Sequence, residues 1–430
     1  MRRWAIVIVV LIAAVALAAI GFFFWPAPLP NVADARSKLG PDSAKRGEYL
    51  VRAADCAACH TLGNGKPFAG GLPFTLPFGT IYATNITPDK ETGIGLWSDA
   101  EFVRALHSGV SRDGKDLYPA FPYTSYANMT TEDALAIKDY LFTVEPFHAA
   151  APQSKLGFPY NQRFLMRAWK LLFLSSRAGD DPKLKPDQNR GAYLVEALGH
   201  CGECHTPRNK MFALDRAKKF EGAVTAGWKA YNISSDKEQG IGAWTDDQLA
   251  EYLSKGHAKG RGSASGSMAE AVEFSIRFLN EPDLRAMVSY LRTVPPQNGS
   301  KEGVVATDPV PVKASTPLTP GGEGGGSLGM TMFESACASC HAWNGEGVQH
   351  PQAALVGSQT VNDPEGTNLI QVLLEGSHIQ TEEGDAFMPK FGLAYTDEEL
   401  AALSNFVIAH FGGKESHITA QQVSNARHPQ

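Results

Sequence analysis

The chain has 430 residues and a formal net charge of −6 at pH 7, and charged residues make up 20% of it. Because lysine and arginine are dispersed along the sequence, the composition argues against nucleic-acid binding and against a polybasic membrane-binding surface. At this length, two to four domains are expected.

The N-terminal segment is strongly apolar. After Met1-Arg2-Arg3, residues 4–25 carry no charged side chain. At about 1.5 Å rise per residue they predict roughly 33 Å of helix, enough to cross a bilayer core. Since the arginines precede this segment, the positive-inside rule places everything that follows it outside the cytoplasm. We therefore expect residues 1–30 to form a membrane anchor.

A cleaved signal peptide is the alternative for the same segment, with Ala16-Leu17-Ala18 as the small-residue cleavage site. Cleavable apolar regions usually run about 7–15 residues. The longer run here, and its aromatic end Phe22-Phe23-Phe24-Trp25, favour a retained anchor. Both interpretations export the chain.

A five-residue unit then occurs three times, and successive copies are 145 and 136 residues apart: Cys56-Ala-Ala-Cys59-His60, Cys201-Gly-Glu-Cys204-His205 and Cys337-Ala-Ser-Cys340-His341. Two cysteines three positions apart, followed at once by histidine, form the attachment signature of c-type haem. Thiols at i and i+3 lie on one side of a helical turn, so both can form thioethers to one porphyrin. The adjacent imidazole then binds the iron.

Zinc or disulfide pairs are the alternative for these cysteines. Zinc would need a second pair or further ligands at matching spacing. All six cysteines of the chain fall inside the three units. The sequence therefore predicts three covalently bound haem c groups.

The sequences around the first two Cys-x-x-Cys-His units resemble each other. Short helices are predicted over residues 46–56 and 190–201, before each unit, and Asn85–Trp97 matches Asn232–Trp244. Capping boxes and closing helices follow at equivalent places: Ser98-x-x-Glu101 and Thr245-x-x-Gln248, then residues 131–143 and 281–293. Residues 31–148 and 186–297 are therefore predicted to be two copies of one domain.

A third, shorter domain is predicted over residues 327–412, where Thr396-x-x-Glu399 opens the last helix. The segment at 149–185 contains a basic, apolar run. Its apolar residues are too few to span a bilayer. It is predicted to pack across a domain boundary or to dock on a partner or the membrane surface. Residues 298–326 have the composition of a flexible linker, and 413–430 that of a polar tail. Strand signals are few, so the predicted fold class is all-α: three tandem cytochrome c domains after one N-terminal transmembrane helix.

Electron transfer without substrate binding needs a sixth iron ligand, and methionine is a common one. Met129, Met268 and Met388 each follow a haem unit, at 69, 63 and 47 residues from its histidine, and each precedes a closing helix. The other candidates considered have weaker positions. Met287, Met330 and Met332 are assigned to the core, and four histidines remain alternative nitrogen ligands: His107, His257, His378 and His410.

These residues resemble a known family, the triheme cytochrome c subunits of bacterial membrane-bound periplasmic dehydrogenases, over residues 40–412. The resemblance rests on the three haem units and on four further motifs: Asn-Ile-Thr-Pro-Asp…Gly-Ile-Gly-x-Trp97, Pro119-Ala-Phe-Pro-Tyr-Thr-Ser-Tyr-Ala-Asn-Met129-Thr, Ser-Gly-Ser-Met268-Ala-Glu and Met388-Pro-Lys-Phe. It implies that the three methionines are the axial ligands. Where this chain has Phe121, the family often has methionine, so this departure removes an alternative ligand in the first domain.

The resemblance also implies a role. A catalytic partner of the molybdopterin, flavin or quinone type oxidises an alcohol, aldehyde or sugar acid in the periplasm, and this chain passes the electrons to ubiquinone. The long anchor resembles that of the cytochrome subunit that accompanies molybdenum and iron–sulfur aldehyde dehydrogenases, which implies a small iron–sulfur or accessory subunit as a further partner. The expected place is the bacterial inner membrane, with the haem domains facing the periplasm. The chain alone is expected not to be an enzyme. A subunit donating to a terminal oxidase, and a haem peroxidase or reductase, are the rival functions.

Overall fold

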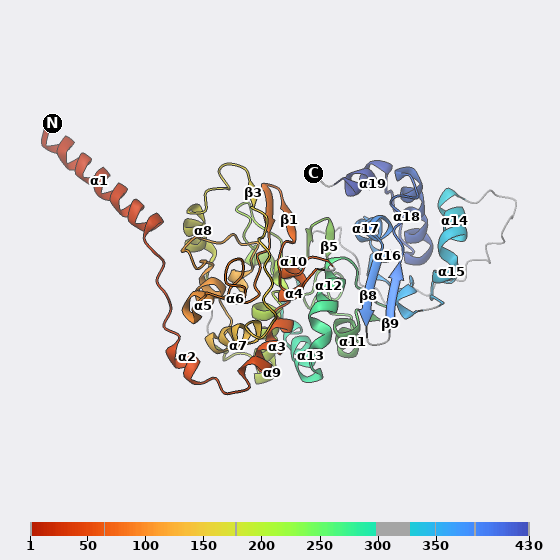
Figure 1. The fold of residues 1–430 in the computed structure, drawn as a ribbon. Helices are drawn as coiled ribbons and strands as arrows, with labels where there is room; N and C mark the ends of the chain where they lie inside the picture. The colour runs from red at the N-terminus through yellow and green to blue at the C-terminus, as the bar shows by residue number, and fades with distance from the viewer. Residues whose placement is uncertain are drawn as a thin grey trace. The chain divides into compact units, whose positions relative to one another are not determined.

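The computed structural model describes residues 2–63, 65–176, 179–297, 327–348, 350–381 and 384–428. The chain divides into two compact units (Figure 1). Unit 1 comprises Met1–Val51 and Cys59–Gly179, and unit 2 comprises Arg52–Ala58 and Asp180–Gln430. The predicted flexible linker, residues 298–326, lies outside the described residues.

The first half of the chain is mainly helical, with a small antiparallel sheet of order β1-β2-β3. Its helices are α1 (Arg2–Phe24), α2 (Ala33–Ser37), α3 (Ser43–Ala53), α4 (Cys56–His60), α5 (Asp99–Ser108), α6 (Tyr123–Tyr126), α7 (Thr131–Leu141) and α8 (Leu165–Phe173). Its strands are β1 (Pro73–Leu76), β2 (Gly79–Tyr82) and β3 (Lys155–Leu156).

Helix α1 is the one helix of the described residues that is long and apolar enough to span a membrane. None of its apolar window is buried against protein. Figure 1 shows it projecting as a single extended helix, and its contacts with unit 1 are made at its C-terminal end beside α8. Its length and position fit both the predicted anchor and the alternative signal peptide.

The second half begins with α9 (Pro186–Ala192), which continues as the π-helical turn η1 (Tyr193–Leu198). The following helices are α10 (Gly202–His205), α11 (Asp246–Lys255), α12 (Ser267–Phe274) and α13 (Glu281–Leu291), with short turns η2 (Arg216–Lys218) and η3 (Ile276–Phe278). Two two-stranded sheets accompany them: β4 (Ala223–Thr225) with β5 (Trp228–Ala230), and β6 (His257–Ala258) with β7 (Gly262–Ser263).

The C-terminal part comprises α14 (Leu328–Met332), η4 (Phe333–Cys337), α15 (Ala338–His341), η5 (Pro351–Ala353), α16 (Gln359–Asn362), α17 (Thr367–Glu375), α18 (Asp397–Gly412) and α19 (Ala420–Arg427). Strands β8 (Ser377–Thr381) and β9 (Gly384–Met388) pair antiparallel. The fold is thus predominantly helical, but the all-α prediction omitted these small sheets. Their strands are too short to give a period-two pattern in the sequence.

The predicted capping boxes are present at the three helices that open after them. Ser98, Thr245 and Thr396 accept from the N3 backbone of α5, α11 and α18, and the N3 side chain bonds back to each N-cap. Each box satisfies two donors that a helix start otherwise leaves unpaired. These contacts fix where the helices after each haem unit begin.

One helix crossing is repeated three times. Gly47 of α3, Gly191 of α9 and Gly329 of α14 each lie so close to a later helix that a Cβ would overlap its backbone. The partners are a carbonyl oxygen and an aromatic Cβ four residues on: Ala136 and Tyr140 in α7, Ala286 and Tyr290 in α13, and Ala402 and Phe406 in α18. Figure 1 shows the third crossing, with α14 beside α18. Glycine permits backbone contact that any other residue would prevent.

The residues predicted as a polar tail include α19, which the sequence analysis did not anticipate. Val423 of α19 is fully buried, and Ile418 just before it is 5% exposed. Both belong to a hydrophobic core with Ile408 and Phe411 of α18. The last described residues therefore complete the core around α18.

Within unit 2, β5 is tied to α17. The backbone N–H of Lys229 donates to Asn368 Oδ1 at 2.7 Å, and Asn368 Nδ2 donates to the Lys229 carbonyl at 2.9 Å. Lys229 Nζ lies 3.1 Å from Asp363 Oδ2 and 2.7 Å from Glu365 Oε2. These polar contacts join the region of the second haem unit to that of the third.

Candidate haem-binding sites

Helix α4 presents the first haem unit. It spans Cys56–His60, so the two thiols lie one helical turn apart, with the histidine directly after them. His60 Nδ1 lies 2.6 Å from the Thr84 carbonyl oxygen. Because a carbonyl only accepts, Nδ1 carries the hydrogen, which leaves the Nε2 lone pair free to bind a metal. Histidines that ligate metals are held in this way.

The other two histidines have the same arrangement. His205 Nδ1 lies 2.6 Å from the Tyr231 carbonyl, and His341 Nδ1 lies 2.7 Å from the Ala353 carbonyl. Burial lowers the pKa of all three imidazoles, and the hydrogen bond to the carbonyl opposes this shift only in part. The neutral imidazole, which is the metal-binding form, is therefore favoured at pH 7.

The repeated Asn-Ile motif holds the first two carbonyl acceptors in place. Thr84 and Tyr231 directly precede its asparagines. Asn85 Nδ2 donates to the Phe147 carbonyl at 2.7 Å, and Asn232 Nδ2 donates to the Gln297 carbonyl at 2.7 Å. Each asparagine Oδ1 also accepts from the backbone two residues on, at 2.8 Å. The motif thus fixes the loop that orients each histidine.

The six cysteines all lie among the described residues, and none of them is in a disulfide. Burial raises the pKa of Cys201 to about 12 and that of Cys337 to about 11. Zinc binding needs the thiolate, which these environments disfavour. No group of three or more His, Cys, Asp or Glu side chains suited to a metal ion occurs among the described residues. The donor set fits covalently attached haem, with a thiol pair on one turn and an imidazole whose Nε2 is free.

In the first two haem units, the residue directly before the first cysteine of the unit has a positive φ angle, which the sequence did not show. Asp55 and His200 have φ values of 53° and 37°, in the region that favours glycine. The strained position turns the chain from the preceding helix into the haem unit. Burial, with Glu270 nearby, raises the pKa of Asp55 well above its usual value, so the carboxyl group takes its neutral form more readily.

The three candidate methionines occupy different settings. Met129 lies between α6 and α7 and is buried, with 4% of its surface exposed. Met268 opens α12 and Met388 ends β9, and both are partly buried against hydrophobic cores. As assigned from the sequence, Met287 and Met332 are core residues. Axial ligation by the three candidates remains a prediction.

Among the alternative histidines, His107 contacts the backbone of a candidate methionine. Its ring is hydrogen-bonded to the Met129 backbone, and burial lowers its pKa more than this bond raises it. Its Nε2 is buried, and no described residue satisfies it. His257 instead pairs with Ser263 Oγ at 3.0 Å, and His410 stacks on Phe406.

Two buried arginines bind backbone carbonyls. Arg104 donates to three of them: Ala27 at 3.1 Å, Ser111 at 2.7 Å and Arg112 at 3.2 Å. Arg261 donates to the Ala243 carbonyl at 2.7 Å. Both side chains are buried and hold loops together.

Comparisons with known proteins agree with this geometry. The cytochrome c family model matches residues 327–409. The chain is 38% identical over 408 residues to the fructose dehydrogenase cytochrome subunit of Gluconobacter japonicus, covering 90% of this chain and 82% of that protein. It is 36% identical to the gluconate 2-dehydrogenase cytochrome c subunit of Pantoea cypripedii, covering 89% of each. A diheme cytochrome c-type protein of Cereibacter sphaeroides is 39% identical over 259 residues, covering 59% of this chain and 86% of its own length.

Proposed function

The chain belongs to the family of cytochrome c subunits of dehydrogenase complexes, and we propose that it carries electrons from a catalytic dehydrogenase subunit to ubiquinone through three covalently bound haem c groups. It is an electron-transfer subunit and not the catalytic one. The proposed partner oxidises an alcohol, aldehyde or sugar acid.

The observation that carries this proposal is the threefold imidazole arrangement. Each of His60, His205 and His341 directs Nδ1 to a backbone carbonyl at 2.6–2.7 Å. Bound haem iron would supply one-electron redox chemistry. The protein's part is to fix the porphyrin through two cysteines and to hold each imidazole in the tautomer that binds metal. The threefold glycine crossing supports three domains of one type.

The axial set proposed is Met129, Met268 and Met388, one for each haem. Two methionine-bearing segments are held by local structure. Met388 pairs with Ser377 across the β8–β9 hairpin, and the Met129 backbone is held by His107. A sixth ligand that stays bound would keep each site from binding substrate, which favours electron transfer over peroxidase or reductase chemistry.

The proposed place is the inner membrane, with α1 retained as the anchor and the haem domains in the periplasm. Support comes from the 22-residue apolar span Arg3–Phe24 and from the positive charge at its N-terminal end. This position would bring the chain to the quinone pool.

The experiment is to purify the full chain from detergent-solubilised membranes and identify the proteins that accompany it. We expect a dehydrogenase with a flavin, quinone or molybdopterin cofactor, and quinone reduction that requires its substrate. Co-purification with a copper–haem oxidase core would contradict this and favour the terminal-oxidase role. Carbon monoxide binding by the native reduced protein would show a displaceable sixth position and favour haem-enzyme chemistry.

A further inference from the structure

Helix α8 exposes an apolar face. Leu171 is 73% exposed, Leu172 65% and Leu165 36%. At about 100° per residue, Leu165 and Leu172 lie on one side of the helix, and Leu171 lies about 100° further round, away from Trp169. Phe158, before the helix, is 81% exposed. Large apolar side chains gathered on one exposed face mark an interaction surface more often than single exposed residues do.

The rest of α8 is fixed within unit 1 by Trp169, which adjoins the leucine face, and by Lys170, which lies on the side away from it. Trp169 is 7% exposed and packs edge-on against Tyr123, with ring centroids 6.3 Å apart. Lys170 Nζ lies 2.5 Å from Asp116 Oδ1, and both side chains are almost completely buried. Because these contacts set the rotation of the helix, the leucine face is held outward.

The same helix is attached to the C-terminal end of α1. Arg167 Nη1 donates to the carbonyls of Phe22 at 2.8 Å and Trp25 at 2.6 Å. The Phe164 ring contacts the rings of Phe23 and Phe24, with centroids 5.6 Å away in both cases. The aromatic end of a membrane-spanning helix lies at the headgroup level. The leucine face therefore starts at that depth.

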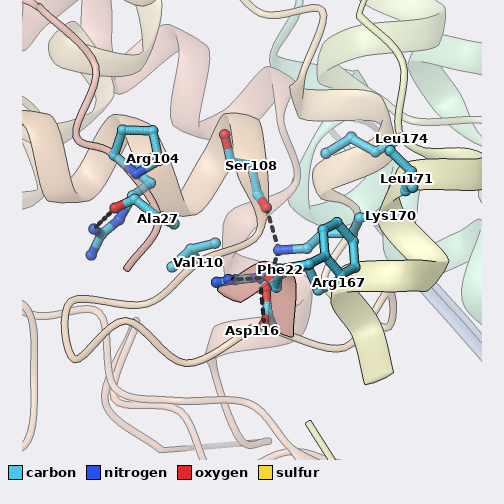
Figure 2. A pocket seen from close by; sticks show the side chains of 11 residues that line it. Phe22, Ala27, Arg104, Ser108, Val110, Asp116, Arg167, Lys170, Leu171 and Leu174 are labelled. Atoms are coloured by element: carbon cyan, nitrogen blue, oxygen red, sulfur yellow. Dashed lines mark hydrogen bonds and ion pairs between the residues drawn. The ribbon is translucent and has the colours of Figure 1, made fainter. Parts of the chain in front are cut away.

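Figure 2 shows the pocket that α1 and α8 share with neighbouring loops. Its charged lining consists of Arg104, Arg167, Lys170 and Asp116. Arg167 and Lys170 both pair with Asp116, and Arg104 donates to three backbone carbonyls, so these charges hold α8 and the end of α1 to the rest of unit 1. The observation that favours lipid is therefore the apolar, exposed face of a helix fixed beside the end of the proposed anchor.

We propose that α8 is a second membrane contact, with its leucine face in the headgroup–acyl boundary of the leaflet where α1 ends. This rests on the proposed retention of α1 as an anchor. Its consequence is orientation. A single span leaves the attached domain free to rotate about the membrane normal and to tilt, whereas a second contact holds unit 1 at a fixed height and tilt.

The test places a photoreactive benzoylphenylalanine in the full haem-loaded chain, reconstituted in nanodiscs of phosphatidylcholine and phosphatidylglycerol. The positions are Leu172 in α8, Leu11 in α1 and Val224 in β4. Leu11 and Val224 are 59% and 64% exposed, so their exposure is close to the 65% of Leu172. Each variant is first checked for an unchanged haem spectrum. Illumination is followed by mass spectrometry of lipid adducts.

We expect lipid adducts at Leu172 at least about tenfold above those at Val224, and adducts at Leu11. Adducts at Leu11 with Leu172 at the Val224 level would overturn the α8 contact and leave the anchor and the electron-transfer role intact. Adducts from Leu172 to a protein would also overturn it, since they would assign the face to a partner or a second copy. Absence of adducts at both Leu11 and Leu172 would overturn the anchor and the α8 contact together.

Discussion

His60 donates its Nδ1 hydrogen to the carbonyl of Thr84 across 2.6 Å. The equivalent bond from His205 to the carbonyl of Tyr231 has the same length, although the accepting residue is a tyrosine there and a threonine in the first case. A backbone acceptor makes the bond independent of the identity of the accepting residue. The repeated sequence therefore needs only to hold the loop, which its asparagine does.

Replacing one axial methionine should alter one haem of the three. In Met388→Ala the thioether is lost, so we expect about a third of the methionine–iron charge-transfer absorption of the oxidised protein to disappear. The potential of that haem should fall because methionine ligation raises it. Optical redox titration measures both. Met332→Leu, a buried change in α14, is the matched control and should leave the absorption unchanged. An intact band in Met388→Ala would remove Met388 from the ligand set.

A single methyl group at the first helix crossing should destabilise unit 1. In Gly47→Ala the new Cβ overlaps the Ala136 carbonyl, so α3 and α7 must move apart, at a cost of about 1–3 kcal/mol. Thermal unfolding followed by circular dichroism measures the loss. Gly40→Ala is the control, since no atom lies within 4 Å of its added Cβ. Equal midpoints for the two variants would mean that the crossing is not close-packed.

The ion-pair cluster at the start of α5 should make unit 1 sensitive to acid. Asp99 accepts from Arg36 Nε at 2.8 Å and from Lys138 Nζ at 2.7 Å. Burial raises the pKa of Asp99, but the two cations outweigh burial and the net pKa is lowered. A lowered folded-state pKa stabilises the fold above the unfolded value of about 3.9, and this contribution is lost as pH falls through the folded value.

Asp99→Asn should therefore lower the unfolding midpoint at pH 7, and its difference from the unchanged protein should vanish in acid below the folded-state pKa. Glu145→Gln is the control, because Glu145 is exposed and lies 3.6 Å from Lys66. Thermal scans across pH give the comparison. A difference that is constant with pH would show that the charge of Asp99 is not what stabilises unit 1.

The contact between β5 and α17 should depend on one buried carboxylate. The Asp363 side chain is fully buried beside Lys229. Removing its charge in Asp363→Asn leaves Lys229 with only the more exposed Glu365, and breaking a buried ion pair costs about 3–5 kcal/mol. For a unit of this size, that lowers the unfolding midpoint by about 6–20 °C. Glu365→Gln should cost less than about 1 kcal/mol, as an exposed pair does. Equal shifts of the unfolding midpoint in Asp363→Asn and Glu365→Gln would contradict this role of the buried carboxylate.

Local signals were enough to predict much of this fold. The capping residues Ser98, Thr245 and Thr396 begin helices where predicted, because the cap is formed within four residues. The Cys-x-x-Cys-His units are local signals too, because the cysteine spacing reflects one helical turn, and haem attachment at them stays a prediction. The glycine of each first helix is visible in the sequence, but its partner, such as Ala136, is far away and carries no distinguishing side chain.

Features that depend on tertiary contacts were not predictable. The carbonyl acceptors Thr84, Tyr231 and Ala353 act through their backbones, so no residue type marks them. Strands β8 and β9 exist because a hairpin pairs them. Helix α19 is polar on average, and it is held by the buried Val423, by Ala426 on the same core and by the ion pair between Arg427 and Asp397. Mean composition therefore predicted a tail where a few contacts hold a helix.

The central claim is that three haems are attached to one chain. Mass spectrometry of the intact protein purified from membranes, combined with haem quantification, tests it most directly. We expect a mass equal to the polypeptide plus three covalently added haems, with each proteolytic peptide containing Cys56, Cys201 or Cys337 carrying one. A peptide from any of the three units found without haem in the fully active complex would contradict the account.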